Sequence, residues 1–130
     1  MENYTTWMLA LLLAFGCLDS NDVGEPDTFS TVYDEVLMPS CAFSSCHGGG
    51  AGDLDLSTED LAFDSLVDVE SEVAEGWIRV LPGSADDSYL VAKMEGADGI
   101  SGDTMPPGSV LDPEITHRVR DWIDEGAARD

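Results

Sequence analysis

The sequence has 130 residues, enough for one domain, and its acidic side chains outnumber its basic ones by 27 to 5. The formal net charge of −22 excludes nucleic acids and anionic membrane surfaces as partners, because both are bound through cationic patches. Apolar residues make up 43% of the chain and recur at helical spacing after about residue 27, so we expect a folded domain there.

The first segment of the chain has the composition of an export signal. Residues 7–15 (WMLALLLAF) form an apolar run that is too short to cross a bilayer, which takes roughly 20 residues. Small residues then lead to Cys17, and this resembles a bacterial lipoprotein signal, although no Lys or Arg precedes the cysteine. We expect residues 1–16 to be a lipoprotein-type signal; an ordinary secretory signal or a buried helix are the alternatives.

Residues 17–27 are polar and rich in turn-forming residues, which predicts a tether between a lipid anchor and a folded domain. The expected location is the bacterial periplasm or cell envelope, with membrane attachment only through lipid on Cys17. If Cys17 carries the lipid, Cys41 and Cys46 remain as a pair, so each of the three cysteines has a role.

The remaining residues, 28–130, predict one all-α domain of three to four short helices with long loops. The first helix begins near Thr28 and is stopped by Pro39, just before Cys41. Residues at helical spacing give it one apolar stripe, made of Phe29, Val32, Tyr33, Val36 and Leu37. The glycines of residues 47–56 (HGGGAGDLDL) indicate a loop after it.

Three further segments have helical signals. Residues 57–69 open with capping residues and carry Leu61, Leu66 and Val69 at partly helical spacing. Residues 78–81 are expected to be extended, residues 84–94 to form a short helix, and residues 96–108 to form a long loop. A last helix begins at residues 112–114 (DPE), and its inner stripe contains Ile115, Val119, Trp122, Ile123 and Gly126.

Cys41, Cys46 and His47, in the stretch CAFSSCHGGG, have the strongest chemical signal. A disulfide between these cysteines would close a short loop worth only roughly 2 kcal/mol, and it needs neither the histidine nor the glycines. Zinc, with His117 as a fourth ligand, is disfavoured because adjacent Cys46 and His47 would struggle to face one tetrahedral ion. His117 also falls about 200° around its helix from Ile115, on the polar face.

A covalently attached haem is the third interpretation of this stretch. In the minimal pattern C-x-x-C-H, two thiols add to the porphyrin's vinyl groups and the following histidine ligates the iron. The spacing between Cys41 and Cys46 is two residues longer than in that pattern, and His47 follows directly.

The iron of such a haem takes a second axial ligand, and a thioether there raises the reduction potential. Met105 is the candidate, because Pro106 and Pro107 restrict the loop GDTMPPG that presents it. Met94 is spaced for core packing against Leu90, and Met38 falls opposite the apolar stripe of its helix.

In order, the chain carries a helix, CAFSSCHGG, LDLS, RVLPGSADDSYLVAKM, GDTMPPG and LDPEITHRVRDWIDEGA, and it resembles class I c-type cytochromes. It is most similar to planctomycete-type cytochrome c domains, over residues 28–128. The resemblance implies a cytochrome c fold in which the first and last helices cross and one haem c lies between loops. It further implies that Cys41 and Cys46 form thioethers, that His47 is the proximal ligand and that Met105 is the distal ligand.

These observations predict a monohaem carrier that transfers single electrons between exported redox partners, rather than an enzyme. The charge of −22 predicts that those partners present positive patches. Two alternatives remain: a haem subunit of a larger oxidoreductase, and a disulfide-stapled exported lipoprotein that acts as a non-redox binding module.

Overall fold

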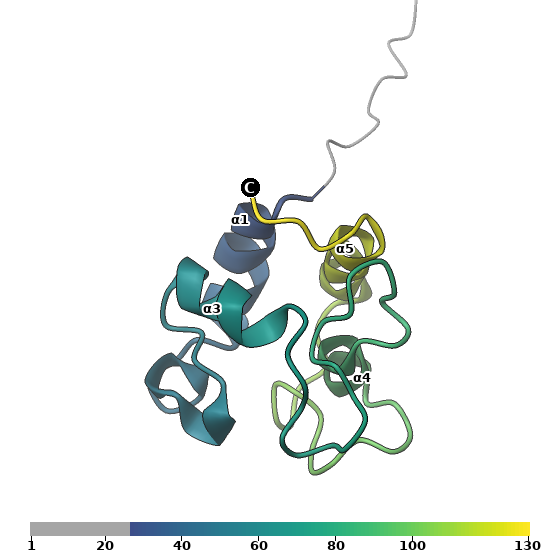
Figure 1. Cartoon of the computed structure of the whole chain (residues 1–130). Coiled ribbons are helices and arrows are strands. Elements are labelled where there is room, and N and C mark those ends of the chain that lie inside the picture. Colours follow the sequence, from purple (N-terminus) through teal and green to yellow (C-terminus); the bar gives the residue numbers. More distant parts are fainter. Residues whose placement is uncertain (1–26) are drawn as a thin grey trace, which may run out of the picture.

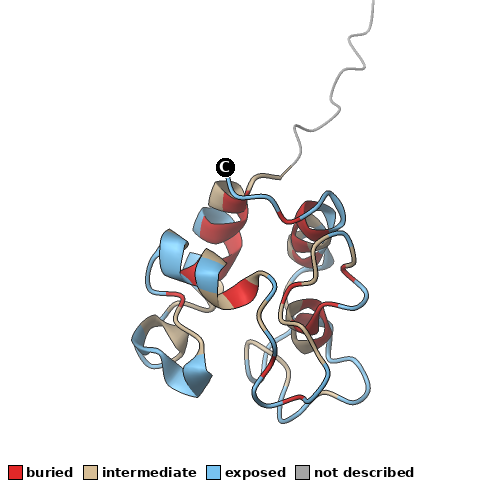
Figure 2. Ribbon diagram, viewed as in Figure 1, coloured by how far each residue is buried: buried red, intermediate tan, exposed pale blue. Residues whose placement is uncertain are grey.

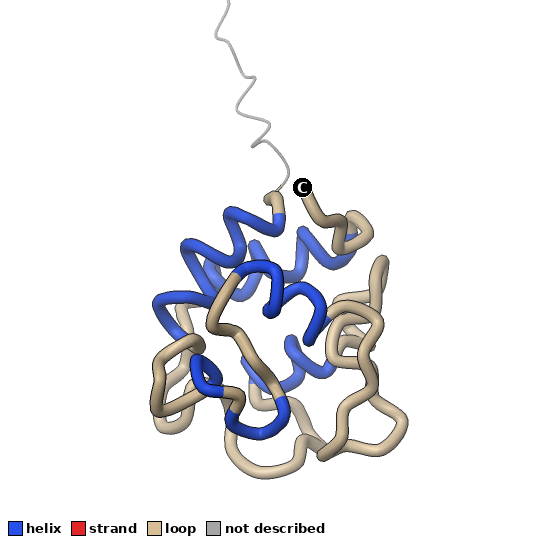
Figure 3. The backbone as a smooth tube through the Cα atoms, turned by 60° about the vertical axis from the view of Figure 1, so that its left-hand side comes forward, coloured by secondary structure: helices blue, strands red, loops and turns tan. Residues whose placement is uncertain are grey.

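The computed structural model describes residues 27–130, so the expected export signal (1–16), Cys17 and residues 18–26 of the expected tether lie outside it. Within this range the chain forms four helices and no strand (Figures 1 and 3), which confirms the all-α prediction. None of these helices has the length and apolar character needed to cross a bilayer.

The first helix runs through three consecutive elements, α1 (Phe29–Val32), the wider turn η1 (Tyr33–Leu37) and α2 (Met38–Ser40). Thr28 caps it, because its hydroxyl oxygen accepts a hydrogen bond of 3.2 Å from the backbone N–H of Thr31. The predicted stripe is confirmed, since each of its five residues is buried: Phe29, Val32, Tyr33, Val36 and Leu37.

Pro39 lies inside the last turn of this helix, which ends at Ser40, directly before Cys41. The backbone N–H of Met38 bonds to the carbonyl of Tyr33, one residue further back than in an α-helix. Because proline donates no N–H and crowds the preceding turn, a wider turn before Pro39 accommodates its ring without breaking the helix.

The second helix, α3 (Glu59–Leu66), is shorter than predicted, and the expected stripe is only partly correct. Thr58 caps it by accepting from the N–H of Leu61, and the buried face consists of Ala62 and Leu66. Leu61 is 43% exposed, because the face through Ala62 and Leu66 turns it outward. Val69 lies beyond the helix end.

In the segment 78–81, expected to be extended, Ile78 and Val80 form only isolated bridges, with Glu70, Ser88 and Val67, so no strand forms there. Val80 is fully buried and its N–H bonds to the carbonyl of Leu66. The next helix, α4 (Tyr89–Glu95), begins later than predicted. Ser88 instead holds a turn, since its hydroxyl accepts from the N–H of Leu81 and donates to the carbonyl of Ser84.

The last helix, α5 (Pro113–Asp124), begins as predicted, with Asp112 accepting a hydrogen bond of 2.9 Å from the N–H of Glu114. Val119, Trp122 and Ile123 of the predicted stripe are buried, whereas Ile115 is half-buried. Gly126 was expected inside and is exposed, because the chain has already left the helix there. Ala127 takes the buried place, 2% exposed.

The core joins the first helix to α3 and α5 through aromatic rings. The ring of Phe29 lies 5.0 Å from that of Phe63 and 5.1 Å from that of Trp122, measured between centroids. Figure 2 shows the buried faces of the helices turned toward one another, and α5 contacts both α1 and α4. The C-terminus returns to the start of α1, where Asp130 accepts from the N–H of Ser30 (Figure 1).

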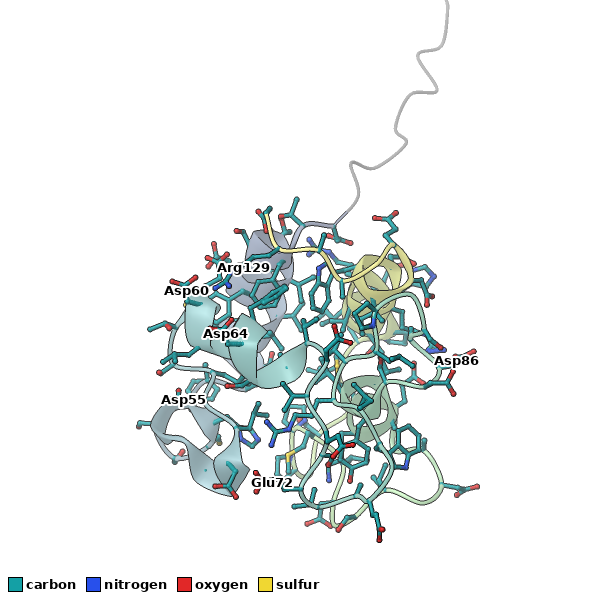
Figure 4. The ribbon with its side chains drawn as sticks, in the orientation of Figure 1. Asp55, Asp60, Asp64, Glu72, Asp86 and Arg129 are labelled. Atoms are coloured by element: carbon teal, nitrogen blue, oxygen red, sulfur yellow. The ribbon has the colours of Figure 1, made fainter. Side chains whose placement is uncertain are left out.

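Three arginines join distant segments through carboxylates. Arg118 on α5 binds Asp27 and Glu35, and the hydrogen bonds that it donates to both carboxylates raise its pKa above the usual value. Arg129 lies beside Asp60 and Asp64 of α3 (Figure 4). Arg120 binds Asp86 and Glu95, on another side of the molecule. Asp27, at the end of the expected tether, is therefore already attached to the domain.

Replacing Val80, which is fully buried, by alanine should lower the free energy of unfolding by about 2 kcal/mol. The same change at Val110, which is 85% exposed, should alter it by less than about 0.5 kcal/mol. Urea unfolding of the purified protein measures both values, and equal losses would contradict this core.

Candidate functional site

A cavity of about 280 Å3 lies between the loops that follow the first helix, α3 and α4. This is close to the lower end of the roughly 300–1,000 Å3 typical of small-molecule sites. Apolar side chains form most of its wall: Leu54, Leu56, Leu66, Leu90 and Met94. Cys41, His47 and Met105 line the same cavity, so the fold brings together three of the four residues expected to hold a cofactor.

Cys46, the fourth of these residues, is half-buried in the loop beside the cavity and is not part of its wall. The loop turns tightly, because the N–H groups of Cys46 and Gly48 both bond to the carbonyl of Phe43, at 2.8 and 2.9 Å. Gly48 is required by this turn, since a Cβ there would lie 2.2 Å from the carbonyl oxygen of Ala42. The steric demand of this turn therefore explains why a glycine follows His47.

The His47 ring is oriented by its own loop. Its Nδ1 lies 2.8 Å from the carbonyl oxygen of Ala51, which can only accept a hydrogen bond, so Nδ1 carries the proton in this contact. In a neutral imidazole the lone pair then resides on Nε2, and this arrangement is the usual one for a metal-ligating histidine. Gly52 lies beside the ring, and its φ of +68° favours glycine there, whereas a Cβ would make only an ordinary contact of 3.8 Å with Cε1 of His47.

The Cys41 thiol behaves as a neutral, apolar part of the cavity wall. Burial, and secondly the neighbouring Cys46, raises the pKa of Cys41 to about 11. The group is therefore a protonated thiol at neutral pH. Both Cys41 and Cys46 have free thiols in this structure.

Met105 lies half-buried in the long loop after α4, and its backbone N–H bonds to the carbonyl of Lys93 at 2.8 Å. Met94 is 4% exposed and packs in the core, which confirms its predicted place, but it lines the cavity as well. Met38 is 49% exposed, in agreement with its position opposite the stripe. Two methionines, not one, thus contact the cavity.

Sequence reasoning missed two basic side chains in the cavity wall, Arg79 and Lys93. Arg79 donates to the carbonyls of Ser65 and Asp53, at 2.8 and 3.2 Å. Lys93 donates to two carbonyls of the Met105 loop. Among residues 27–130 neither forms an ion pair with a carboxylate, whereas the other three basic residues, Arg118, Arg120 and Arg129, all do.

The scarcity of basic residues was the signal that could have drawn attention to Arg79 and Lys93. The chain has only 5 of them against 27 acidic residues, so a carboxylate partner is available for each. A cation that is left without such a partner and that lines a cavity indicates a place for an anionic ligand group.

His117 lies away from the cavity, with a side chain 73% exposed and an Nδ1 that is 2.9 Å from a carboxylate oxygen of Asp121. Its predicted position on the polar face of α5 is therefore confirmed. In the part of the chain that the structure describes, no three His, Cys, Asp or Glu side chains gather closely enough to share a metal ion.

No protein-family model, curated protein or solved structure matches this chain. The resemblance to cytochromes c therefore depends on the motif residues themselves. The structure adds that Cys41, His47 and Met105 line one cavity of a small domain with four helices.

Replacing Gly48 by alanine should lower the free energy of unfolding by about 3 kcal/mol, because the new Cβ would collide with backbone. Gly49 is the matched control, since its nearest atom would be 3.3 Å away and its alanine variant should stay within about 1 kcal/mol of the parent. Denaturant midpoints measure both, and a well-tolerated alanine at position 48 would rule out this loop geometry.

Proposed function

We propose that the chain is a monohaem c-type cytochrome with a cytochrome c fold, which transfers single electrons between exported redox partners. The observation that carries the proposal is the meeting of Cys41, His47 and Met105 at one apolar cavity. Cys41 and His47 come from one loop, and Met105 comes from a loop 58 residues further along the chain. In this proposal they are an attachment group and two iron ligands.

The cavity suits a haem in three respects. Its wall is mainly aliphatic, as an apolar macrocycle requires. Arg79 and Lys93 line it and have no carboxylate partner within residues 27–130, so they match the carboxylate substituents that a haem carries. The Nε2 of His47 has a free lone pair, because Nδ1 is committed to Ala51.

The proposed roles follow from the chemistry of the side chains. Cys41 and Cys46 supply the two thiols for thioether links, and His47 supplies the proximal nitrogen. Met105 supplies a thioether sulfur as the distal ligand. A bound haem supplies an iron that changes its oxidation state by one electron. With His47 and Met105 both bound to the iron, no coordination position would be left for a substrate, which favours a carrier over an enzyme.

The surface charge defines the kind of redox partner. Two acidic residues, Glu72 and Asp103, line the cavity and both are exposed (Glu72 is labelled in Figure 4). With a formal charge of −22, the protein attracts partners that present positive patches and repels nucleic acids. We place it in the bacterial periplasm or cell envelope, held to the membrane only by lipid on Cys17.

Covalent attachment is the direct test of this function. The full precursor, produced in a host with haem-ligation machinery, should give a haem-stained band on a denaturing gel and the mass of the peptide, its lipid and one haem. Cys41→Ser and Cys46→Ser should each remove one thioether link, and the double variant should release haem on denaturation. A colourless folded protein with a mass two hydrogens below that of the dithiol would instead support the disulfide-stapled module.

Changing Met105 to leucine should abolish the far-red absorption band of the thioether–iron bond, lower the reduction potential and open the iron to added imidazole. Met94→Leu is the matched control, since it changes a second methionine of the same wall and should keep the band at a stability cost below about 1.5 kcal/mol.

Loss of the band in the Met94 variant alone would assign the distal ligand to Met94. Tight imidazole binding by the unchanged protein would show an open iron, and it would favour the haem subunit of an oxidoreductase over the closed carrier.

A further inference from the structure

We propose that Lys93 is a positioning residue that fixes the loop of Met105 and so holds the thioether in place for the iron. The inference rests on the proposed function, because it concerns the distal ligand of the same site. Lys93 lies on α4 and contacts the loop from both its backbone and its side chain.

Three hydrogen bonds join Lys93 to alternate residues of the loop. Its Nζ donates to the carbonyl of Ser101 at 2.7 Å and to the carbonyl of Asp103, and its own carbonyl accepts from the N–H of Met105 at 2.8 Å. One residue of a regular helix thus sets the path of the chain up to Met105. Hydrogen bonds from an ionised donor are roughly twice as strong as neutral ones, so the ammonium contributes most of this attachment.

Other α4 residues support the same stretch of the loop. The hydroxyl of Tyr89, one turn before Lys93, accepts from the N–H of Ser101 at 3.0 Å. Gly96, at the end of α4, allows close approach of Thr104, because a Cβ there would lie 2.6 Å from its methyl carbon. A series of contacts therefore holds residues 101–105 against α4, and among these contacts only the bonds from the Lys93 ammonium involve a charged group.

The loop has no regular structure with which to order itself. Residues 96–108 contain no helix or strand, and a loop of this length takes its conformation from external contacts. Pro106 and Pro107 restrict the chain after Met105, but nothing in the sequence stiffens it before that residue. The lysine bonds to Ser101 and Asp103 supply this missing restraint.

The composition of the chain makes the partners of Lys93 unusual, because carboxylates are abundant and the lysine binds carbonyl oxygens instead. Lys93 is the only lysine among 130 residues with 27 carboxylates, and within residues 27–130 it bonds to two carbonyl oxygens rather than to any carboxylate. An ammonium on a flexible stem can reach two carbonyls of one turn at the same time.

The test compares Lys93→Met, Lys93→Arg and Arg120→Met in the full haem-loaded protein, through the far-red thioether–iron band and the affinity of the iron for imidazole. Lys93→Met keeps the apolar stem and removes the donors, so we expect a weakened band and about tenfold tighter imidazole binding, equivalent to ~1.4 kcal/mol. Lys93→Arg keeps charge and donors and should restore most of both signals. Arg120→Met removes a cation that binds Asp86 and Glu95 and should leave both unchanged.

Unchanged band and imidazole affinity in Lys93→Met would overturn the inference, and so would equal effects of Lys93→Met and Arg120→Met. If Lys93→Met does not fold, the unchanged haem-loaded protein is treated with an acetylating reagent, which neutralises its single lysine. Acetylation should produce the same tighter imidazole binding, and no change there would equally overturn the inference. A wild-type protein without stained haem would refute the proposed function itself, which separates the two failures.

Discussion

The candidate site depends on the hydrogen bond between Nδ1 of His47 and the carbonyl of Ala51. A histidine beside two cysteines could present either ring nitrogen, and only the loop decides which one is free to bind a metal. Gly48 makes that loop possible by letting its backbone approach Ala42, and the preceding turn brings His47 to the cavity that Cys41 lines. The orientation of the imidazole is thus built into a segment of fewer than fifteen residues.

The five basic residues fall into two groups according to what they bind. Arg118, Arg120 and Arg129 each bind two carboxylates, and together they join the start of α1, α3 and α4 to the C-terminal helix and tail. Arg79 and Lys93 are directed instead to the cavity and its loops. The net charge of −22 gives the protein a strongly acidic exterior. Within residues 27–130, the only two basic side chains without a carboxylate partner lie next to the proposed cofactor.

Three details of the helices were predicted wrongly from the sequence, and each has a physical cause in the folded structure. Leu61 has the right residue type for a core position, but α3 presents Ala62 and Leu66 to the core and turns Leu61 to solvent. Residues 84–87 have helix-forming signals, yet the Ser88 hydroxyl holds them in a turn, because it accepts from the N–H of Leu81 and donates to the carbonyl of Ser84. The end of α5 displaces Gly126 from the stripe and substitutes Ala127, because the backbone reverses there.

The sequence by itself determined the helical class, the five-residue stripe of the first helix, the start of the last helix at Asp112 and the residue types of the candidate site. These follow from local rules, since periodicity, capping and motif spacing act within a few residues. Only the tertiary structure decided that Met105 and Met94 share a cavity with His47, which imidazole nitrogen is free, and which two cations lack acidic partners within residues 27–130. The shared cavity and the unpaired cations come from contacts between segments distant in the chain, and the free nitrogen comes from the folded conformation of the loop at residues 47–51. No sequence pattern encodes which of these groups will meet.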